Sequence, residues 1–263
     1  MSVVDVHPHV IAGDTRRYPF APLGGKQSDW SRERPVDAGK MLAAMDEAGI
    51  ERSVLVQAST CYGHDNSYVA DAVAAHPDRF AGVFSVDMLA ADAPQRIRHW
   101  LARGLKGLRV FIAGHTASHD VRLDDPRSFP AWRCAVDEGI PVCVQLRAPG
   151  LPQLEALLRE FPSARIVLDH MARPAPGEPA SLLALARHPN LFLKFTTHNV
   201  RDAADPQAFL RTVVAAFGAK RIAWGSNYPA SEGTLMSLLA EAKNVVSAGD
   251  QEWIFSRTAR TLY

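Results

Sequence analysis

The sequence predicts a (β/α)8 TIM barrel that forms a single domain over residues 1–263. Eight short runs rich in β-branched and aromatic residues alternate with eight helical runs, which is the pattern of a parallel sheet. The length of 263 residues suits this barrel, which typically takes about 250 residues. No GxGxxG motif opens a helix after the first strand, which disfavours the doubly wound open sheet as the alternative.

The expected strands are short apolar runs that lie between longer helical patterns. In chain order they are Val3–His7, Arg52–Gln57, Phe80–Asp87, Gly107–Ile112, Pro141–Leu146, Ala164–Asp169, Leu191–Thr196 and Arg221–Gly225.

The expected helices have apolar residues at three- and four-residue spacing. In chain order they are Asp37–Ala48, Ser67–Ala75, Ala93–Ala102, Phe129–Asp137, Leu151–Glu160, Ser181–Ala186, Pro206–Phe217 and Thr234–Val246. Gly49, Gly104, Gly139 and Gly218 follow helical runs, where a left-handed glycine cap is common. The long segment Ile11–Pro35 fits no helix, and loops of such length are usually functional.

Composition and charge narrow the classes of function. With Lys+Arg 29 against Asp+Glu 28, the chain has no positive excess of the kind that binds nucleic acid or an anionic membrane. Cys61, Cys134 and Cys143 form no CxxC pair, so neither a disulfide framework nor a cysteine zinc site is indicated. No signal peptide and no apolar run of about 18 residues is found. We therefore expect a cytoplasmic protein that acts on a small molecule, with a homo-oligomer left open.

Polar residues follow the expected strands at the barrel face where enzymes of this fold assemble their active sites. The candidates are His7, His9, Gln57, Arg109, Gln145, Arg147, His170, Lys194, Thr196, His198 and Asn227. Because residues two apart share one side of a strand, Asp5, His7 and His9 are expected to project into the same space. Single histidines at strand ends are usually structural, and Arg109 and Lys194 could be charges without a role.

Motifs spread over almost the whole chain resemble one known family. They are Asp5-x-His7-x-His9, Val167–His170 followed by Pro174, Trp224–Pro229, Asp46–Ile50 and Gly104–Arg109. The chain resembles the amidohydrolase superfamily, and in particular the amidohydrolase-2 branch. That branch includes 2-pyrone-4,6-dicarboxylate lactonase, sugar lactonases and related decarboxylases.

The resemblance leaves the metal question open. Metal-dependent members use a His or a bridging Lys from strand four or five, whereas strand five here presents Gln145. His7, His9 and His170 could supply the three protein ligands that a catalytic zinc usually needs. The 2-pyrone-4,6-dicarboxylate lactonase branch works without a tightly bound metal, and Gln145 fits that branch better. We therefore expect no required cofactor, with one zinc or manganese ion as the alternative.

Position 227 departs from the family pattern. Family members end strand eight with an Asp that acts as general base or proton shuttle, whereas this chain has Asn227. An amide cannot accept and hold a proton near neutral pH. Three explanations remain: an inactivated variant, a different base such as His170 or His198, or a protein that no longer catalyses hydrolysis.

The resemblance implies a hydrolase that opens a lactone, or a related cyclic ester or amide, of a small polar acid. His7, His9 and His170 would polarise the carbonyl, and Arg109 and Arg147 would bind a substrate carboxylate. The remaining expected substrate contacts are Gln57, Gln145, Lys194, Thr196 and His198. The alternatives are a metal-dependent nonoxidative decarboxylase or other lyase of the same family, and a non-catalytic binding protein.

Overall fold

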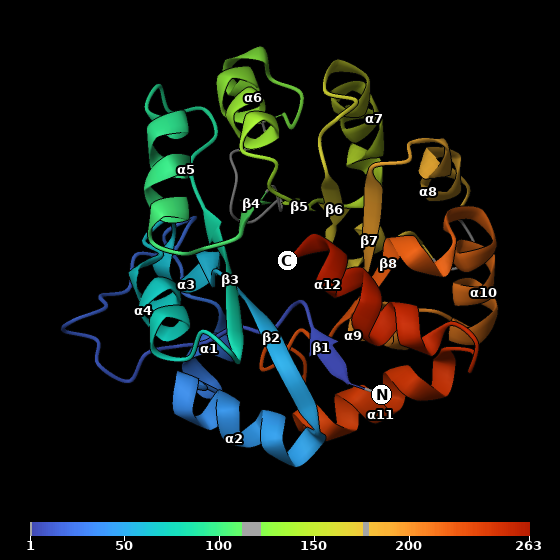
Figure 1. Ribbon diagram of the computed structural model, residues 1–263, viewed down its shortest axis with the longest axis horizontal. Coiled ribbons are helices and arrows are strands. Elements are labelled where there is room, and N and C mark those ends of the chain that lie inside the picture. The colour runs from blue at the N-terminus through green and yellow to red at the C-terminus, as the bar shows by residue number, and fades with distance from the viewer. Residues whose placement is uncertain (1, 112–121, 176–178) are drawn as a thin grey trace.

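The computed structural model describes residues 2–111, 122–175 and 179–263, and in these residues eight parallel strands pair in the order β1 to β8. The strands are β1 (Val3–Asp5), β2 (Ile50–Val56), β3 (Phe80–Ser85), β4 (Gly107–Phe111), β5 (Val142–Gln145), β6 (Ile166–Leu168), β7 (Leu191–Thr196) and β8 (Ile222–Gly225). Figure 1 shows them as a ring with helices outside it, which confirms the predicted barrel. Ile112, the last residue of the predicted fourth strand, lies outside the described residues.

Most of the helices lie around the outside of the ring, whereas α12 (Thr258–Leu262) lies across its middle (Figure 1). In chain order the helices are α1 (Asp29–Glu33), α2 (Ala38–Ala48), α3 (Ser59–Tyr62), α4 (Ser67–Ala75), α5 (Ala93–Ala102), α6 (Phe129–Asp137), α7 (Leu151–Glu160), α8 (Ala180–Leu183), α9 (Thr197–Arg201), α10 (Pro206–Phe217), α11 (Leu235–Val245) and α12. Five of the predicted helices have these bounds to the residue. The prediction that Ile11–Pro35 contains no helix is wrong, because α1 forms one turn there, with an ion pair between Arg32 and Asp29.

Capping side chains and a glycine explain where several helices begin and end. The Asp37 carboxylate accepts a hydrogen bond from Lys40 N at the start of α2, so the predicted first residue is the cap rather than part of the helix. Thr234 caps α11 in the same way. Gly49 ends α2 with φ of 67°, the left-handed conformation that glycine adopts without steric cost.

The barrel has an apolar layer on each side of its strands. Outward-facing strand residues pack against the helices, whereas Val4, Val56, Cys143 and other inward residues form a separate cluster. Leu262 and other residues of α12 complete that inner cluster, and Figure 1 shows α12 across the middle of the ring. No helix of the described ranges is both long and apolar enough to cross a membrane.

The seam between β1 and β8 closes the ring. Val6 N donates to Trp224 O at 3.1 Å, and Ser226 N donates to Asp5 Oδ1 at 2.9 Å. The same Asp5 oxygen accepts from His7 N at 3.0 Å. Asp5, the last residue of β1, therefore binds both sides of the seam.

Gly225 is required by the closeness of this seam. A Cβ atom at position 225 would lie 2.5 Å from His7 Cβ, too close for two carbon atoms. A side chain there would push β8 away from β1 and displace His7.

We expect Gly225→Ala to lower the thermal unfolding midpoint by several degrees. Overpacking typically costs about 1–3 kcal/mol, and each kcal/mol shifts the midpoint of a chain of this size by about 2–4 °C. Circular dichroism melting measures the shift. Gly249→Ala is the matched control, because a Cβ at Gly249 has no atom within 4 Å. Equal midpoints for the two variants would contradict the constraint at the seam.

Candidate active site

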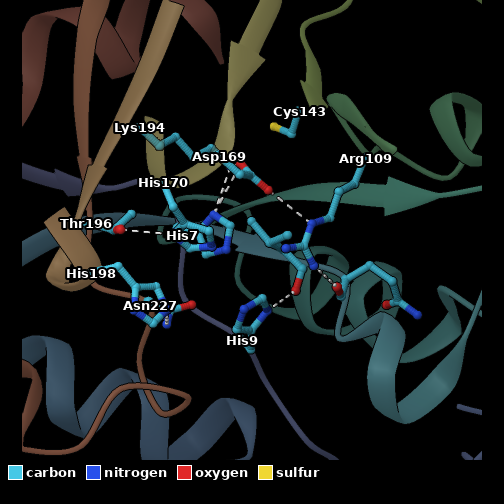
Figure 2. Close-up of polar contacts among 12 residues, drawn as sticks. His7, His9, Arg109, Cys143, Asp169, His170, Lys194, Thr196, His198 and Asn227 are labelled. Atoms are coloured by element: carbon cyan, nitrogen blue, oxygen red, sulfur yellow. Dashed lines mark hydrogen bonds and ion pairs between the residues drawn. The ribbon is translucent and has the colours of Figure 1, made fainter. Parts of the chain in front are cut away.

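Five strands and the segments after them bring most of the predicted site residues together at one end of the barrel. Figure 2 shows His7, His9, Arg109, His170, Lys194, Thr196, His198 and Asn227 around one point, with Asp169 among them. The rings of His7 and His9 have centroids 5.1 Å apart, and those of His7 and His170 are 4.7 Å apart. His198 lies on the other side of His170, with ring centroids 5.0 Å apart. The four predicted histidines thus form one continuous cluster.

The hydrogen bonds of His9 and His170 define which ring nitrogen carries the proton. His9 Nδ1 lies 2.8 Å from Val56 O, and a carbonyl oxygen only accepts, so Nδ1 must be the donor. His170 Nδ1 lies 2.9 Å from Thr196 Oγ1. Because the Thr196 hydroxyl donates to Asn199 Oδ1 at 3.3 Å, it accepts the proton of His170 Nδ1. The neutral forms of both rings therefore present a lone pair at Nε2.

The backbone at His170 is strained. His170, Met171, Ala172 and Arg173 have φ values of 55°, 52°, 57° and 47°, so four consecutive residues that are not glycine are left-handed. This conformation costs roughly 1–2 kcal/mol per residue. The Asn199 amide holds the turn by donating from Nδ2 to His170 O at 2.9 Å. Strain of this kind is typical of functional sites, where surrounding contacts enforce it.

A buried group of charges lies behind His7. Lys194 Nζ is 3.0 Å from His7 Nδ1 and 3.0 Å from Asp169 Oδ1. Arg109 Nε donates to the other oxygen of Asp169 at 3.2 Å, and Arg109 Nη1 donates to Gln57 O at 3.3 Å. Asp169 and Lys194 are fully buried, and Arg109 is nearly so. One carboxylate thus joins two cations inside the barrel.

Burial keeps the histidine cluster neutral. Desolvation and the charge of Lys194 lower the pKa of His7 well below its usual range. Desolvation also lowers the pKa of His170 well below its usual range, that of His9 to about 3 and that of His198 to about 4. Burial alone would raise the pKa of Asp169, but the charge of Lys194, the contact with His7 and the charge of Arg109 together outweigh it and hold that pKa well below the usual range. Near pH 7 the cluster consists of neutral rings beside an ionised carboxylate.

Asn227 lies beside His198 in the same group of side chains (Figure 2). Its amide Nδ2 donates to Ser231 Oγ at 3.0 Å and is 3.5 Å from His198 Nε2. Its backbone has φ of 58°, a left-handed conformation that Asn and Asp tolerate better than most residues. Asn227 thus lies beside the histidine cluster, next to His198.

Several predicted substrate contacts have protein partners instead. Lys194 is fully buried, and the Thr196 hydroxyl is bonded to His170 and Asn199. Gln57 donates from Nε2 to the backbone oxygens of Gly63 and Asp65. These side chains support the site rather than line it.

The other predicted contacts differ in exposure. Gln145 is half-buried at the end of β5, and its Oε1 is buried without a hydrogen-bond partner among the residues that the structure describes. Arg147 is exposed, and its charge contributes to the lowered pKa of His198, which places it near that ring.

Three residues of the site are absent from the sequence prediction. Asp169 binds both buried cations, Asn199 holds the left-handed turn, and Ser231 binds Asn227. Asp169 had a signal, since it precedes His170 at the end of a strand. Asn199 and Ser231 lie beyond strand ends and have no such signal.

The donor set does not fit a catalytic metal ion. Neutral His9 and His170 each have a free lone pair at Nε2. His7 does not, because its Nδ1 accepts from the Lys194 ammonium and its proton is therefore on Nε2. Position 227 offers a neutral amide in place of a carboxylate. Within the described residues, no three or more His, Cys, Asp and Glu side chains are arranged to hold a metal ion. Catalytic zinc usually needs three protein ligands, and only two are presented here.

Comparisons with known proteins agree with this architecture. Residues 4–263 match the family described as amidohydrolase. Over 244 aligned residues, the chain is 31% identical to an L-fucono-1,5-lactonase of Burkholderia ambifaria, with 87% of this chain and 80% of the relative covered.

Two solved structures share the fold. A Pseudomonas putida protein proposed to be a 2-pyrone-4,6-dicarboxylic acid hydrolase has a TM-score of 0.83 at 23% identity, with 99% of this chain and 97% of that chain covered. A 2,6-dihydroxybenzoate decarboxylase in complex with 2,6-dihydroxybenzoate has a TM-score of 0.75 at 18% identity, with 100% and 99% covered. The family match over nearly all of the sequence, together with the lactonase relative, shows that this chain belongs to the amidohydrolase family.

Proposed function

We propose that this protein hydrolyses a lactone of a small polar acid. The observation that supports the proposal best is the pairing of one hydrogen-bond donor with an adjacent base. The neutral His7 ring carries its proton on Nε2, whereas the neutral His170 ring has a lone pair on Nε2. The centroids of the two rings are 4.7 Å apart. Ester hydrolysis needs both functions side by side. The named lactonase relative supports the same reaction class.

His7 supplies the donor for the developing oxyanion. His7 Nε2 is buried and has no hydrogen-bond partner among the described residues. An unpaired buried donor is costly unless a ligand binds it. Removing one oxyanion donor typically slows acyl transfer by about 10²–10³-fold. The sequence assigned this role to His9 and His170 as well, but their neutral rings cannot donate from Nε2.

His170 is the residue that accepts the proton of the attacking water. Both His170 and His198 were candidates, since Asn227 cannot act as a base. Asn227 Nδ2 lies 3.5 Å from His198 Nε2, at the limit of a hydrogen bond, and His198 is only partly buried. The Thr196 and Asn199 chain instead fixes the His170 proton on Nδ1 and leaves Nε2 available. The water proton passes to this nitrogen and from there to the leaving alkoxide.

The substrate carboxylate is expected near His198. Arg147 and Arg173 both lie close enough to affect the pKa of His198, and Arg147 has no ion-pair partner among the described residues. Arg109, by contrast, is already bonded to Asp169. A cavity of about 350 Å³ lined in part by His198, Arg173 and Phe209 gives room for the rest of a small acid.

A cytoplasmic location without a required cofactor is part of the proposal. It is supported by three free thiols, Cys61, Cys134 and Cys143, which suit a reducing compartment, and by the incomplete metal donor set.

The direct test is a panel of lactones, followed by release of acid with a pH indicator. The panel contains five- and six-membered lactones of sugar acids and of dicarboxylic acids. We expect turnover of at least one member, and turnover that persists after dialysis against a chelator. Release of carbon dioxide from an aromatic acid would favour the lyase, if this activity is lost when the chelator removes the metal. Ligand binding without conversion by the protein or by its Asn227→Asp variant would favour the binding protein.

We expect His170→Gln to lower kcat on the best lactone by about 10²–10⁴-fold, because glutamine cannot take up the water proton. His76→Gln, at an exposed histidine, is the control. The pH profile gives a second readout. Protonation removes the lone pair only below the lowered pKa of His170, so the rate should hold as the pH falls through about 6.5, the ordinary histidine value. A fall in rate centred there would contradict this assignment.

We expect Asn227→Asp to raise the hydrolysis rate by about 10²–10⁴-fold with little change in structure. The two side chains are nearly isosteric, and the carboxylate adds a group that can accept a proton. It should also raise the pKa of His198 from about 4, since an opposite charge favours the protonated ring. The variant should therefore gain an acidic limb in its pH profile, and Asn244→Asp on the surface should not. An unaltered rate and profile would remove position 227 from the mechanism.

A further inference from the structure

Lys194 is a buried charged group that the proposed mechanism leaves without a direct role. Its side chain is fully buried inside the barrel, so it cannot contact a substrate. Within the described residues its ammonium meets His7 Nδ1 and Asp169 Oδ1, each at 3.0 Å. Figure 2 shows Lys194 and Asp169 on the side of His7 that faces away from Asn227. Lys194 therefore acts on the site through His7.

The ammonium decides which nitrogen of His7 carries the proton. An ammonium group has three donors and no acceptor, so His7 Nδ1 must accept from it. A neutral ring that accepts at Nδ1 has its proton at Nε2. Without the ammonium, Asp169 Oδ1 at 3.5 Å from His7 Nδ1 would be the nearest partner, and it would draw the proton to Nδ1. The ring would then turn a lone pair toward the substrate carbonyl and repel the oxyanion.

Asp169 keeps the ammonium in place, because its Oδ1 lies closer to Lys194 Nζ, at 3.0 Å, than to His7 Nδ1, at 3.5 Å. Its two oxygens are divided between Lys194 and Arg109, on opposite sides of the carboxylate. This arrangement balances part of the buried positive charge and fixes the direction of the lysine side chain. Arg109 and Lys194 lie on β4 and β7, and Asp169 directly follows β6, so the barrel itself sets the geometry.

We propose that Lys194 is a positioning residue that holds His7 in the tautomer protonated at Nε2, as the hydrogen-bond donor for the lactone carbonyl oxygen. The proposal rests on the proposed lactone hydrolysis for its consequence in catalysis. The tautomer itself can be measured without substrate.

The first test uses the unaltered protein. Nitrogen-15 NMR of the histidine rings distinguishes a protonated nitrogen from one with a lone pair, and the His7→Gln variant identifies the His7 signals. We expect the Nε2-protonated form of His7 at neutral pH. A proton on His7 Nδ1 would overturn the proposal, whatever reaction the protein catalyses. If the expected tautomer is found and no lactone is hydrolysed, only the proposed function fails.

The second test replaces Lys194 by methionine, which has similar length and no donor. We expect the proton of His7 to move to Nδ1 and kcat to fall by about 10²–10³-fold, as for the loss of one oxyanion donor, with little change in KM. Lys106→Met, at an exposed lysine, is the control for the same chemical change. Retention of the Nε2-protonated tautomer in Lys194→Met would overturn the proposal.

A double-mutant cycle separates positioning from general support of the fold. If Lys194 acts through His7, Lys194→Met should lower kcat little further in the His7→Gln background. Independent, multiplying losses would contradict action through His7. Should Lys194→Met fail to fold, the tautomer of the unaltered protein still decides the proposal.

Discussion

The buried carboxylate of Asp169 is the constraint on which the site depends. An unpaired charge inside a protein costs several kcal/mol, and removing one partner of a buried pair typically costs about 3–5 kcal/mol. Asp169 therefore needs both Lys194 and Arg109; Asp169 directly follows β6, and its two partners lie on β7 and β4. Any slip of one strand against its neighbours would separate the charges. The same pairing that fixes the register of the strands also fixes the direction of Lys194 toward His7.

This group of charges also determines which chemistry the neighbouring rings can perform. The charge of Lys194 opposes protonation of His7, and the charges of Arg109 and Lys194 oppose protonation of His170. The same positive charges stabilise negative charge that develops on a substrate oxygen. The Lys194 ammonium behind the neutral His7 ring thus provides positive potential and directs the His7 proton to Nε2. The hydrogen bonds through Thr196 and Asn199 place the His170 proton on Nδ1, so its Nε2 has a lone pair where His7 Nε2 has a proton. In the proposed mechanism the two histidines therefore have complementary roles, as base and as donor.

The sequence predicted the barrel well, because alternating strands and helices depend on local apolar patterns. It also placed His7, His9, His170 and Asn227 at one face, since strand ends of a parallel barrel meet there. It did not predict the functions of Lys194 and Thr196, which were expected to contact substrate. Both side chains lie on the predicted seventh strand, but they contact His7 and His170, which are distant in the sequence. The left-handed turn after Asp169 was also missed, because only long-range contacts such as that from Asn199 enforce it.

Position 227 shows how an amide in place of a carboxylate changes the charge of this site. The left-handed backbone there suits Asn and Asp alike, and Ser231 Oγ can accept from an amide or donate to a carboxylate. Neither the backbone nor the hydrogen-bond partner therefore discriminates between the two residues. What differs is charge. With a carboxylate at position 227, a further anion would stand beside His198, which would be a suitable partner for it. With the amide, position 227 adds no charge, and the proposed mechanism assigns proton transfer to the lone pair of His170.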